Sequence, residues 1–281
     1  MATSSKSLNK ADGVADLIGT LVKYKDLLFE LSSRELKDKY INHSLGGAWA
    51  FMSPLLMSGL YIYLFSEVFP SRMGGEYQGP KSLIWLLTGI TVWFMVSDLL
   101  GRSLTAITGS PSLVKQVVFP VEILPAQVVL TGIPTFAVGM MVVLGFVAWV
   151  DPNIFIGAVW MLPLALILFG IICMGLTYLL AAFAPFMQDL REIMAFVSGA
   201  GMFLAPVLYF PPTIENLNPV LKSVLEGNPF THLLACFRDA VFYGQMTQPI
   251  SWAITAVFAL VLAFIGFSMF QRLKPHFSEA I

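Results

Sequence analysis

Residues 154–183 read IFIGAVWMLPLALILFGIICMGLTYLLAAF and contain no Asp, Glu, Lys, Arg or His. A helix needs about 20 apolar residues to cross the hydrocarbon core of a bilayer, and this run exceeds that length. The stretch also lacks the alternation of polar and apolar residues that marks the strands of a transmembrane β-barrel. It therefore predicts a membrane-spanning α-helix.

The whole chain has the composition of an integral membrane protein. Of its 281 residues, 57% are hydrophobic, and the mean hydropathy is +0.78. Only 12% are charged, whereas soluble domains carry about 25%. We expect an all-α protein with six transmembrane helices, the fifth being the shortest. The predicted spans are 50–69, 83–104, 123–150, 154–183, 193–210 and 250–270.

Six spans place both termini on one side of the membrane, and the basic residues indicate which side. If the N-terminus is inside, twelve of the sixteen Lys and Arg residues lie in inner segments and four in outer segments. This bias predicts cytoplasmic termini in a multi-pass protein. Residues 1–20 are small and polar without the apolar region of a signal peptide, so we expect a disordered cytoplasmic tail. Residues 21–281 are expected to form a single transmembrane domain.

Ionisable residues are almost absent from the predicted spans, which bears on how transport would be driven. Ion-coupled carriers place Asp, Glu or His within the membrane, where the ion is exchanged. The second span contains Asp98 and Arg102, an i, i+4 pair near its inner end. The pair either stabilises the helix end, with Arg102 reaching the lipid phosphates, or lines the inner mouth of a transport path. Energy for uphill transport is expected to come from another chain.

Motifs for catalysis, metal binding and nucleotide binding are not found in the sequence. Residues 79–82 read GPKS, but proline interrupts the glycine pattern of a phosphate-binding loop. His43, His232 and His276 are far apart and lack the spacing of metal ligands. We expect no enzyme activity, no catalytic or metal-binding residue, and no cofactor bound by this chain.

Two segments outside the spans have amphipathic patterns. Within 21–43, leucines at helical spacing make one apolar face and charged residues occupy the rest, which predicts a helix lying on the membrane surface. Within 211–249, two apolar-faced pieces flank Asn228-Pro229, a pair suited to cap and start a helix. We expect a re-entrant external hairpin there, the alternative being a loosely docked loop. A shorter helix is predicted from Pro111 to residue 117 in the inner loop before the third span.

Four stretches, taken together and in order, resemble the permease subunit of type-2 family ABC exporters. The resemblance is to the branch that exports lipid-linked O-antigen, capsule and wall teichoic acid. The stretches are 34–40 with Ser44-Leu45-Gly46, Trp49 and Pro54; 115–125 with Phe119-Pro120 and Leu124-Pro125; Asp189-Leu190-Arg191; and Asn228-Pro229-Phe230 through Phe237-Arg238 to Gly244.

The resemblance implies a homodimer in the bacterial cytoplasmic (inner) membrane, working with two copies of a separate ABC ATPase that holds ATP and Mg²⁺. The cargo would be a polyisoprenoid-linked glycan passing through the dimer interface. ATPase coupling would involve Glu35, Lys37, Leu113, Val114, Lys115, Gln116, Asp189, Leu190 and Arg191. The first and fifth spans, with help from the second, would line the substrate path through Tyr61, Phe65, Trp93, Phe94, Asp98, Arg102 and Phe203. The external gate would include Asn228, Pro229, Phe230, Phe237 and Arg238.

Three other interpretations are open. The same machinery could export capsule, teichoic acid, a drug or a small lipid instead of O-antigen. A secondary carrier is a second alternative, which the charge-free spans disfavour. A membrane anchor without transport is a third, and it explains neither the inner loops nor the external hairpin.

Overall fold

The computed structural model describes residues 17, 19–40, 46–68, 79–116, 119–211, 214 and 218–281. Within these residues the chain is helical and contains no strand. Outside them lie residues 1–16 and 18 of the tail predicted at 1–20, the Ser44-Leu45 motif, the end of the first span at Phe69 and the end of the predicted inner helix at residue 117. Residues 17, 19 and 20 of that tail are helical, and Leu17 is buried. Five helices are long and apolar enough to cross a membrane. They are α3 (Trp49–Tyr63, extended by the turns η1, Gly46–Ala48, and η2, Leu64–Val68), α4 (Pro80–Arg102), α6 (Ile123–Val150), α7 (Pro152–Phe183) and α12 (Pro249–Leu273).

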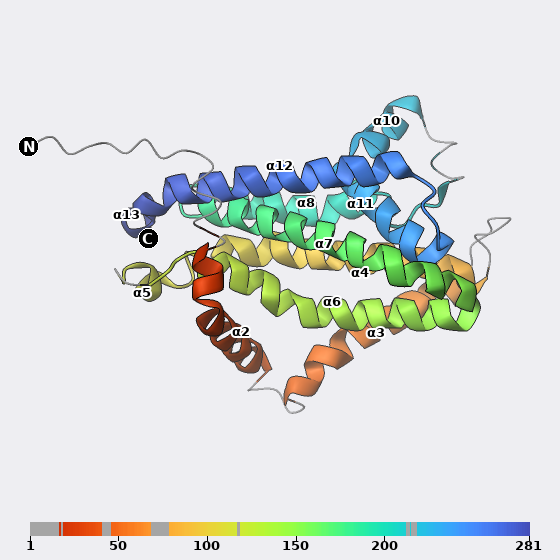
Figure 1. The fold of residues 1–281 in the computed structure, drawn as a ribbon, viewed down its shortest axis with the longest axis horizontal. Helices are drawn as coiled ribbons and strands as arrows, with labels where there is room; N and C mark the ends of the chain where they lie inside the picture. The colour runs from red at the N-terminus through yellow and green to blue at the C-terminus, as the bar shows by residue number, and fades with distance from the viewer. Residues whose placement is uncertain are drawn as a thin grey trace, which may run out of the picture.

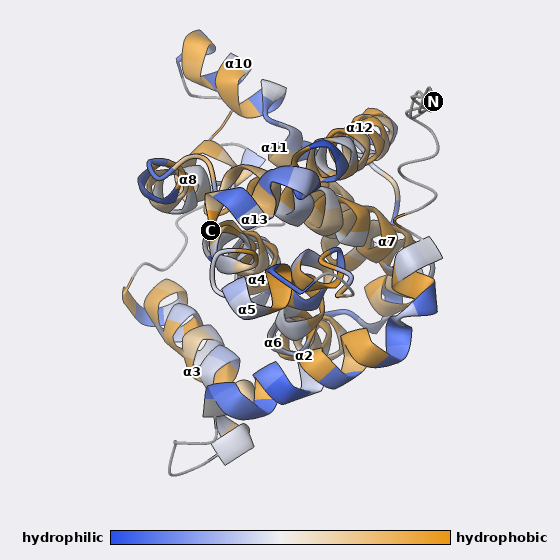
Figure 2. Cartoon of the chain, turned by 90° about the vertical axis from the view of Figure 1, so that its left-hand side faces the viewer, coloured by the Kyte–Doolittle hydropathy of each residue, from blue (hydrophilic) through white to orange (hydrophobic). Residues whose placement is uncertain are grey.

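The helices α4, α6, α7 and α12 run side by side along the long axis of the molecule, and α3 crosses at the edge of this bundle (Figure 1). Seen along that axis, α4 lies towards the middle and α3 at the periphery (Figure 2). In agreement, 78% of the most apolar window of α4 is buried and none of that of α3. The apolar surface of α3 therefore needs lipid or another protein to cover it.

The fifth predicted span, 193–210, is shorter as a helix than the sequence suggested. Helix α8 covers Leu190–Leu204, and its 15 residues reach about 22 Å, against about 30 Å for the bilayer core. It ends because Ala205 precedes Pro206 and takes an extended conformation, as residues before proline do. The predicted span is thus a helix followed by a turn and an irregular segment.

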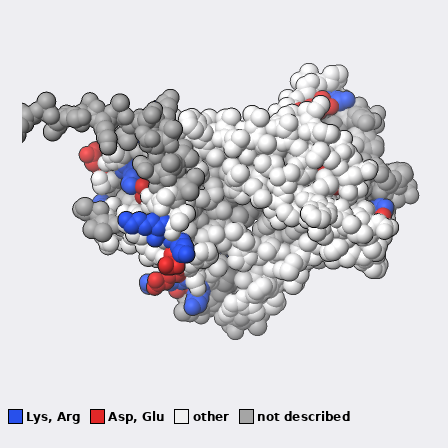
Figure 3. All heavy atoms as spheres, in the orientation of Figure 1, with Lys and Arg blue, Asp and Glu red and all other residues white. Residues whose placement is uncertain are grey.

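The two ends of the bundle carry different elements. One end, which we call the basic end, has α2 (Lys25–Tyr40), α5 (Pro111–Val114) and α13 (Phe277–Ala280). The other, which we call the hairpin end, has α10 (Pro219–Gly227) and α11 (Pro229–Arg238). Charged side chains gather at both ends of the face shown in Figure 3, and the described surface between them is almost free of charge. This distribution fits a bundle whose middle lies in a bilayer.

Within the segment 211–249, the helical stretch after Asn228-Pro229 begins and ends where the sequence predicts. Asn228 caps α11 by accepting a hydrogen bond from the Phe230 backbone N–H at 2.9 Å, and Pro229 is the first helical residue. The side-chain amide of Asn228 also donates to the carbonyl of Leu204, tying α11 to the end of α8 at 3.0 Å. The helical turn η5 (Asp239–Tyr243) follows, and Gly244 ends it with φ of +65°, a conformation that favours glycine.

The C-terminal residues are anchored to the basic end. Phe277 is buried and packs on Phe186 in the turn before α8. Lys274 pairs with Glu122, which is only 4% exposed at the start of α6. Glu122 makes no side-chain capping bond at the start of α6, and Lys274 is its partner. The C-terminal segment therefore contacts both inner loops.

Candidate functional site

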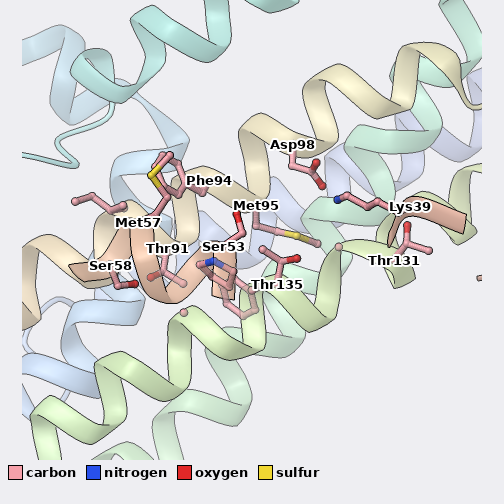
Figure 4. A pocket seen from close by; sticks show the side chains of 15 residues that line it. Lys39, Ser53, Met57, Ser58, Thr91, Phe94, Met95, Asp98, Thr131 and Thr135 are labelled. Carbon is pink, nitrogen blue, oxygen red and sulfur yellow. The ribbon is translucent and has the colours of Figure 1, made fainter. Parts of the chain in front are cut away.

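A pocket of about 320 Å³ lies between α3, α4 and α6, with Lys39 of α2 at its edge (Figure 4). Apolar walls from Met57, Phe94 and Met95 enclose most of it. Its polar lining comes from four helices. These residues are Lys39 on α2; Ser53 and Ser58 on α3; Thr91 and Asp98 on α4; and Thr131 and Thr135 on α6.

Four hydroxyl groups of the pocket differ from that of Thr131, which also lines it, and from that of Thr88 on α4. Thr88 on α4 and Thr131 on α6 donate to the carbonyls of Ile84 and Gln127, which are four residues earlier. Ser53, Ser58, Thr91 and Thr135 form no hydrogen bond with any residue in the described part of the chain. Intrahelical bonding is the usual way to satisfy a hydroxyl in an apolar setting. These four groups are therefore available to something inside the pocket.

Arg102 organises the polar mouth of the pocket. Its guanidinium makes two hydrogen bonds to Asp98, at 2.9 and 2.5 Å, which confirms the predicted i, i+4 pair. It also donates to Thr131 at 2.6 Å and to the carbonyl of Val128 at 3.0 Å. Its second charged partner is Glu35 of α2, at 3.4 Å. Arg102 is thus fully engaged in holding α2, α4 and α6 together, which favours the stabilising interpretation of this residue over direct contact with cargo.

Glu35, a predicted coupling residue, contacts the helix bundle in this structure. Its second carboxylate oxygen accepts a hydrogen bond from Gln127 of α6 at 2.6 Å, so both oxygens face the bundle. A carboxylate engaged with Arg102 and Gln127 gains little from a partner chain. Lys37, two residues on, is exposed and stays a predicted coupling residue.

The predicted path residues fall into two groups. Tyr61 lies between Phe65 and Phe94, with ring centroids 6.4 and 5.8 Å away, and forms an aromatic strip along α3 and α4. Phe203 is 56% exposed on α8. Trp93 is a correction, because it is only 4% exposed and donates to the Ser198 carbonyl at 3.1 Å.

Gly201 explains why Trp93 packs so closely on α8. A side chain on Gly201 would place its Cβ 2.4 Å from the Trp93 ring. Trp93 therefore fastens α4 to α8 and does not line an open path in this conformation.

The two inner loops lie together at the basic end. Helix α5 starts at Pro111, as predicted, and Lys115 and Gln116 after it are exposed, with Leu113 half-buried. Val114, also a predicted coupling residue, is buried in this structure. In the second loop Asp189 and Arg191 are exposed and Leu190 is half-buried. These loops form a charged surface that a partner chain can reach.

At the hairpin end, the predicted gate residues Phe237 and Arg238 are both buried. The Arg238 guanidinium lies 3.8 Å over the Trp85 ring. It donates to the carbonyls of Pro206 and Val207 at 2.9 and 3.0 Å, which fixes α11 against the segment after α8. Sequence reasoning found Arg238 through the Phe-Arg motif and could not identify these partners, because they are backbone groups.

Cysteine labelling tests whether the hairpin is packed or loose. Among single-cysteine variants at 220–242, we expect fast labelling by a membrane-impermeant reagent at the exposed positions 220 and 224 of α10. Along α11 we expect helical periodicity, with protection at the buried 233, 234 and 237. Uniformly fast labelling from 230 to 242 would instead indicate a free loop.

The native cysteines give this labelling experiment a low background. Cys173 and Cys236 are free and buried. Burial raises the pKa of the Cys236 thiol to about 11; the Thr255 hydrogen bond opposes this and the Asp239 charge adds to it. Relative to an unperturbed thiol, this leaves roughly a hundredfold less thiolate at neutral pH.

The structure offers no metal centre in the residues it describes, since no three His, Cys, Asp or Glu side chains come together there. The candidate site is therefore the pocket, its aromatic strip and the two charged ends.

Comparison with known proteins adds evidence from sequence. The sequence profile described as "ABC-2 type transporter" matches residues 26–242. The chain is 29% identical over 270 residues to the O-antigen export system permease protein RfbA of Myxococcus xanthus, covering 94% of this chain and 99% of that protein. It is 24% identical to the RfbA protein of Klebsiella pneumoniae, covering 91% and 95%. It is 23% identical to the polysialic acid transport protein KpsM of Escherichia coli, covering 85% and 90%.

Proposed function

The chain belongs to the ABC-2 type transporter family, and we propose that it is the permease subunit of an ATP-driven exporter that moves lipid-linked O-antigen across the bacterial inner membrane. The observation that carries this proposal is the end-to-end match to two O-antigen export permeases. A match over nearly the whole of both chains supports a shared role better than a shared fragment would.

The energy source is a partner chain. No nucleotide-binding motif occurs in the sequence, and the predicted spans are nearly free of ionisable groups, which argues against an ion-coupled carrier. We place two copies of an ABC ATPase at the basic end, against the loops of α5 and residues 185–192. Both termini are then cytoplasmic, in line with the bias of basic residues.

The transport path lies between two copies of this chain. The pocket between α3, α4 and α6 holds about 320 Å³, whereas a hydrated glycan needs a wider route. The exposed apolar surfaces of α3 and α8 offer protein contacts, and Tyr61, Phe65, Phe94 and Phe203 lie on or beside them. Aromatic rings suit the C–H faces of successive sugars without selecting one of them.

Capsular polysaccharide is a second candidate cargo, because a polysialic acid transport protein is among the relatives. Deleting the gene and comparing surface O-antigen and capsule tests both cargoes. We expect O-antigen to be lost from the surface, with lipid-linked O-antigen accumulating inside, and to be restored by the intact gene. Loss of capsule alone would favour the second cargo, and unchanged surface glycans would reject the function.

Charge reversal at the basic end tests the ATPase interface. We expect Lys115→Glu and Arg191→Glu each to lower the yield of co-purified ATPase roughly tenfold, because like charges across an interface cost on the order of 1–2 kcal/mol or more. Lys222→Glu, on exposed α10 at the hairpin end, is the matched control and should leave the yield unchanged. If all three variants yield as much co-purified ATPase as the wild type in parallel preparations, these loops are not part of the interface.

A further inference from the structure

We propose that the pocket between α3, α4 and α6 is a binding subsite for one uncharged sugar ring. The inference rests on the proposed function for the source of the ring, a glycan cargo, and adds a defined place within a single subunit. The pocket volume of about 320 Å³ is at the lower end of small-ligand sites, roughly 300–1,000 Å³. It accommodates a small cyclic ligand and not a length of polymer.

The hydroxyl lining is the first argument. Ser53, Ser58, Thr91 and Thr135 face the pocket from three helices, and none is bonded to another described residue. Each hydroxyl both donates and accepts hydrogen bonds, as sugar hydroxyls do. A pocket meant for an acyl or isoprenoid chain gains nothing from these groups, because an apolar chain leaves them unsatisfied.

The balance of charge at the mouth is the second argument. The Lys39 ammonium points towards the Asp98 carboxylate across the pocket (Figure 4). Arg102 and Glu35 adjoin them in the same network, giving two cations and two anions. A phosphate or an acidic sugar would meet Asp98 as a like charge. A neutral sugar hydroxyl can donate to Asp98 and accept from Lys39 at the same time.

The wall of the pocket is the third argument. The Phe94 ring lines it and packs on Tyr61 at 5.8 Å, so its position is fixed. Aromatic rings stack on the apolar C–H face of a sugar, while the polar rim pairs with its hydroxyls. Met57 and Met95 complete the wall with adaptable side chains, which suits related rings better than a single one.

The test measures sugar binding to the intact complex with its ATPase, in lipid nanodiscs free of sugar detergents. The probes are glucose, galactose, mannose and rhamnose as neutral rings, glucuronate as an acidic ring, and a polyprenyl phosphate as a lipid. Saturation-transfer NMR gives the affinities, and a photoreactive glycoside with peptide mapping gives the place of binding.

Isosteric variants identify the hydroxyls that act. We expect Thr91→Val with Thr135→Val to weaken binding of a neutral sugar roughly tenfold, from the loss of two hydrogen bonds. Thr88→Val is the control, because Thr88 is on the same helix and bonded to its own backbone. Ser58→Ala, a single smaller change on α3, serves if the double variant is unstable.

Three results would overturn the subsite: no neutral sugar binds the wild-type complex at millimolar concentration, the Val variants bind as tightly as wild type, or polyprenyl phosphate alone occupies the pocket. If these occur while the wild type still exports glycan, the subsite fails and the proposed function stands. If binding follows the prediction but deletion of the gene leaves surface glycans unchanged, the subsite stands and the proposed function fails.

Discussion

Replacing Gly175 by alanine is expected to destabilise the helix bundle by about 1–3 kcal/mol, the usual cost of overpacking a tight contact. A Cβ on Gly175 in α7 would lie 2.6 Å from the Ala263 nitrogen, and 2.7 Å from the Ala263 Cα and the Leu262 carbonyl carbon of α12. All three are backbone atoms, so no side chain can rotate away. The reverse contact is equally close, since a Cβ on Gly266 would lie 2.2 Å from the Gly175 oxygen. The two helices must therefore separate to admit even one methyl group.

Gly170→Ala is the matched control, on the same helix with nothing within 4 Å of the added Cβ. Alanine favours a helix over glycine by roughly 0.5–1 kcal/mol, and this gain is shared by both variants. The midpoint of thermal unfolding of purified protein is the measurement. We expect a lower midpoint for Gly175→Ala and an unchanged or higher one for Gly170→Ala. Equal midpoints would show that α7 and α12 are not in this contact.

Local signals in the sequence predicted most of the fold. The long apolar runs gave five spans whose length and composition the structure confirms, and Asn228-Pro229 and Gly244 fixed both ends of α11 and η5. Such features depend on neighbouring residues, so one sequence suffices to read them. The early end of α8 also has a local cause, because Ala205 precedes Pro206 and is therefore extended. The prediction from hydropathy did not take this proline into account.

Contacts between distant residues could not be predicted in this way. Arg102 and Asp98 are four residues apart and were paired correctly, but Glu35 joins them from 67 residues away. Lys274 and Glu122 are 152 residues apart, and neither has a motif that points to the other. For the same reason the pocket was missed, since its hydroxyls come from three helices and only Asp98 and Phe94 were candidates beforehand.

Trp93 shows why hydropathy alone could not assign a transport path. An aromatic residue deep in a span suits a path wall and a helix contact equally well. Trp93 packs against α8 because Gly201 has no side chain and lets the ring approach. A glycine in the sequence does not indicate which distant residue will pack on it. The aromatic strip of Tyr61, Phe65 and Phe94 keeps its place beside the proposed path.

Replacing Arg238 by alanine is expected to cost about 3–5 kcal/mol of stability and to abolish export of glycan. The side chain is 3% exposed, and its removal takes the donor from two carbonyls, those of Pro206 and Val207. Hydrogen bonds from a charged donor are worth about 1.5–3 kcal/mol each, and a desolvated cation over an indole adds roughly 2 kcal/mol. The hydrogen bonds and the cation–π contact involve the same guanidinium, so their contributions are not additive. We therefore expect about 3–5 kcal/mol, which is less than their sum. Without them α11 is no longer fixed to the segment that follows α8.

Arg238→Lys separates the contribution of the hydrogen bonds from that of the contact with the Trp85 ring. Lys222→Ala is the control. A lysine can still donate to the carbonyls but lacks the planar group that stacks on Trp85, so we expect an intermediate loss. Lys222 is on α10 at the same end of the bundle, paired with Glu226 at 3.7 Å, and its replacement should change the midpoint of thermal unfolding little.

Thermal unfolding and surface O-antigen are measured on the same strains. If Arg238→Ala retains both, the hairpin end is held by its apolar face alone and Arg238 has no part in the gate. If stability falls while export persists, the hairpin stabilises the bundle and does not gate export. A gate that is no longer held to the segment after α8 could not pass glycan at the normal rate.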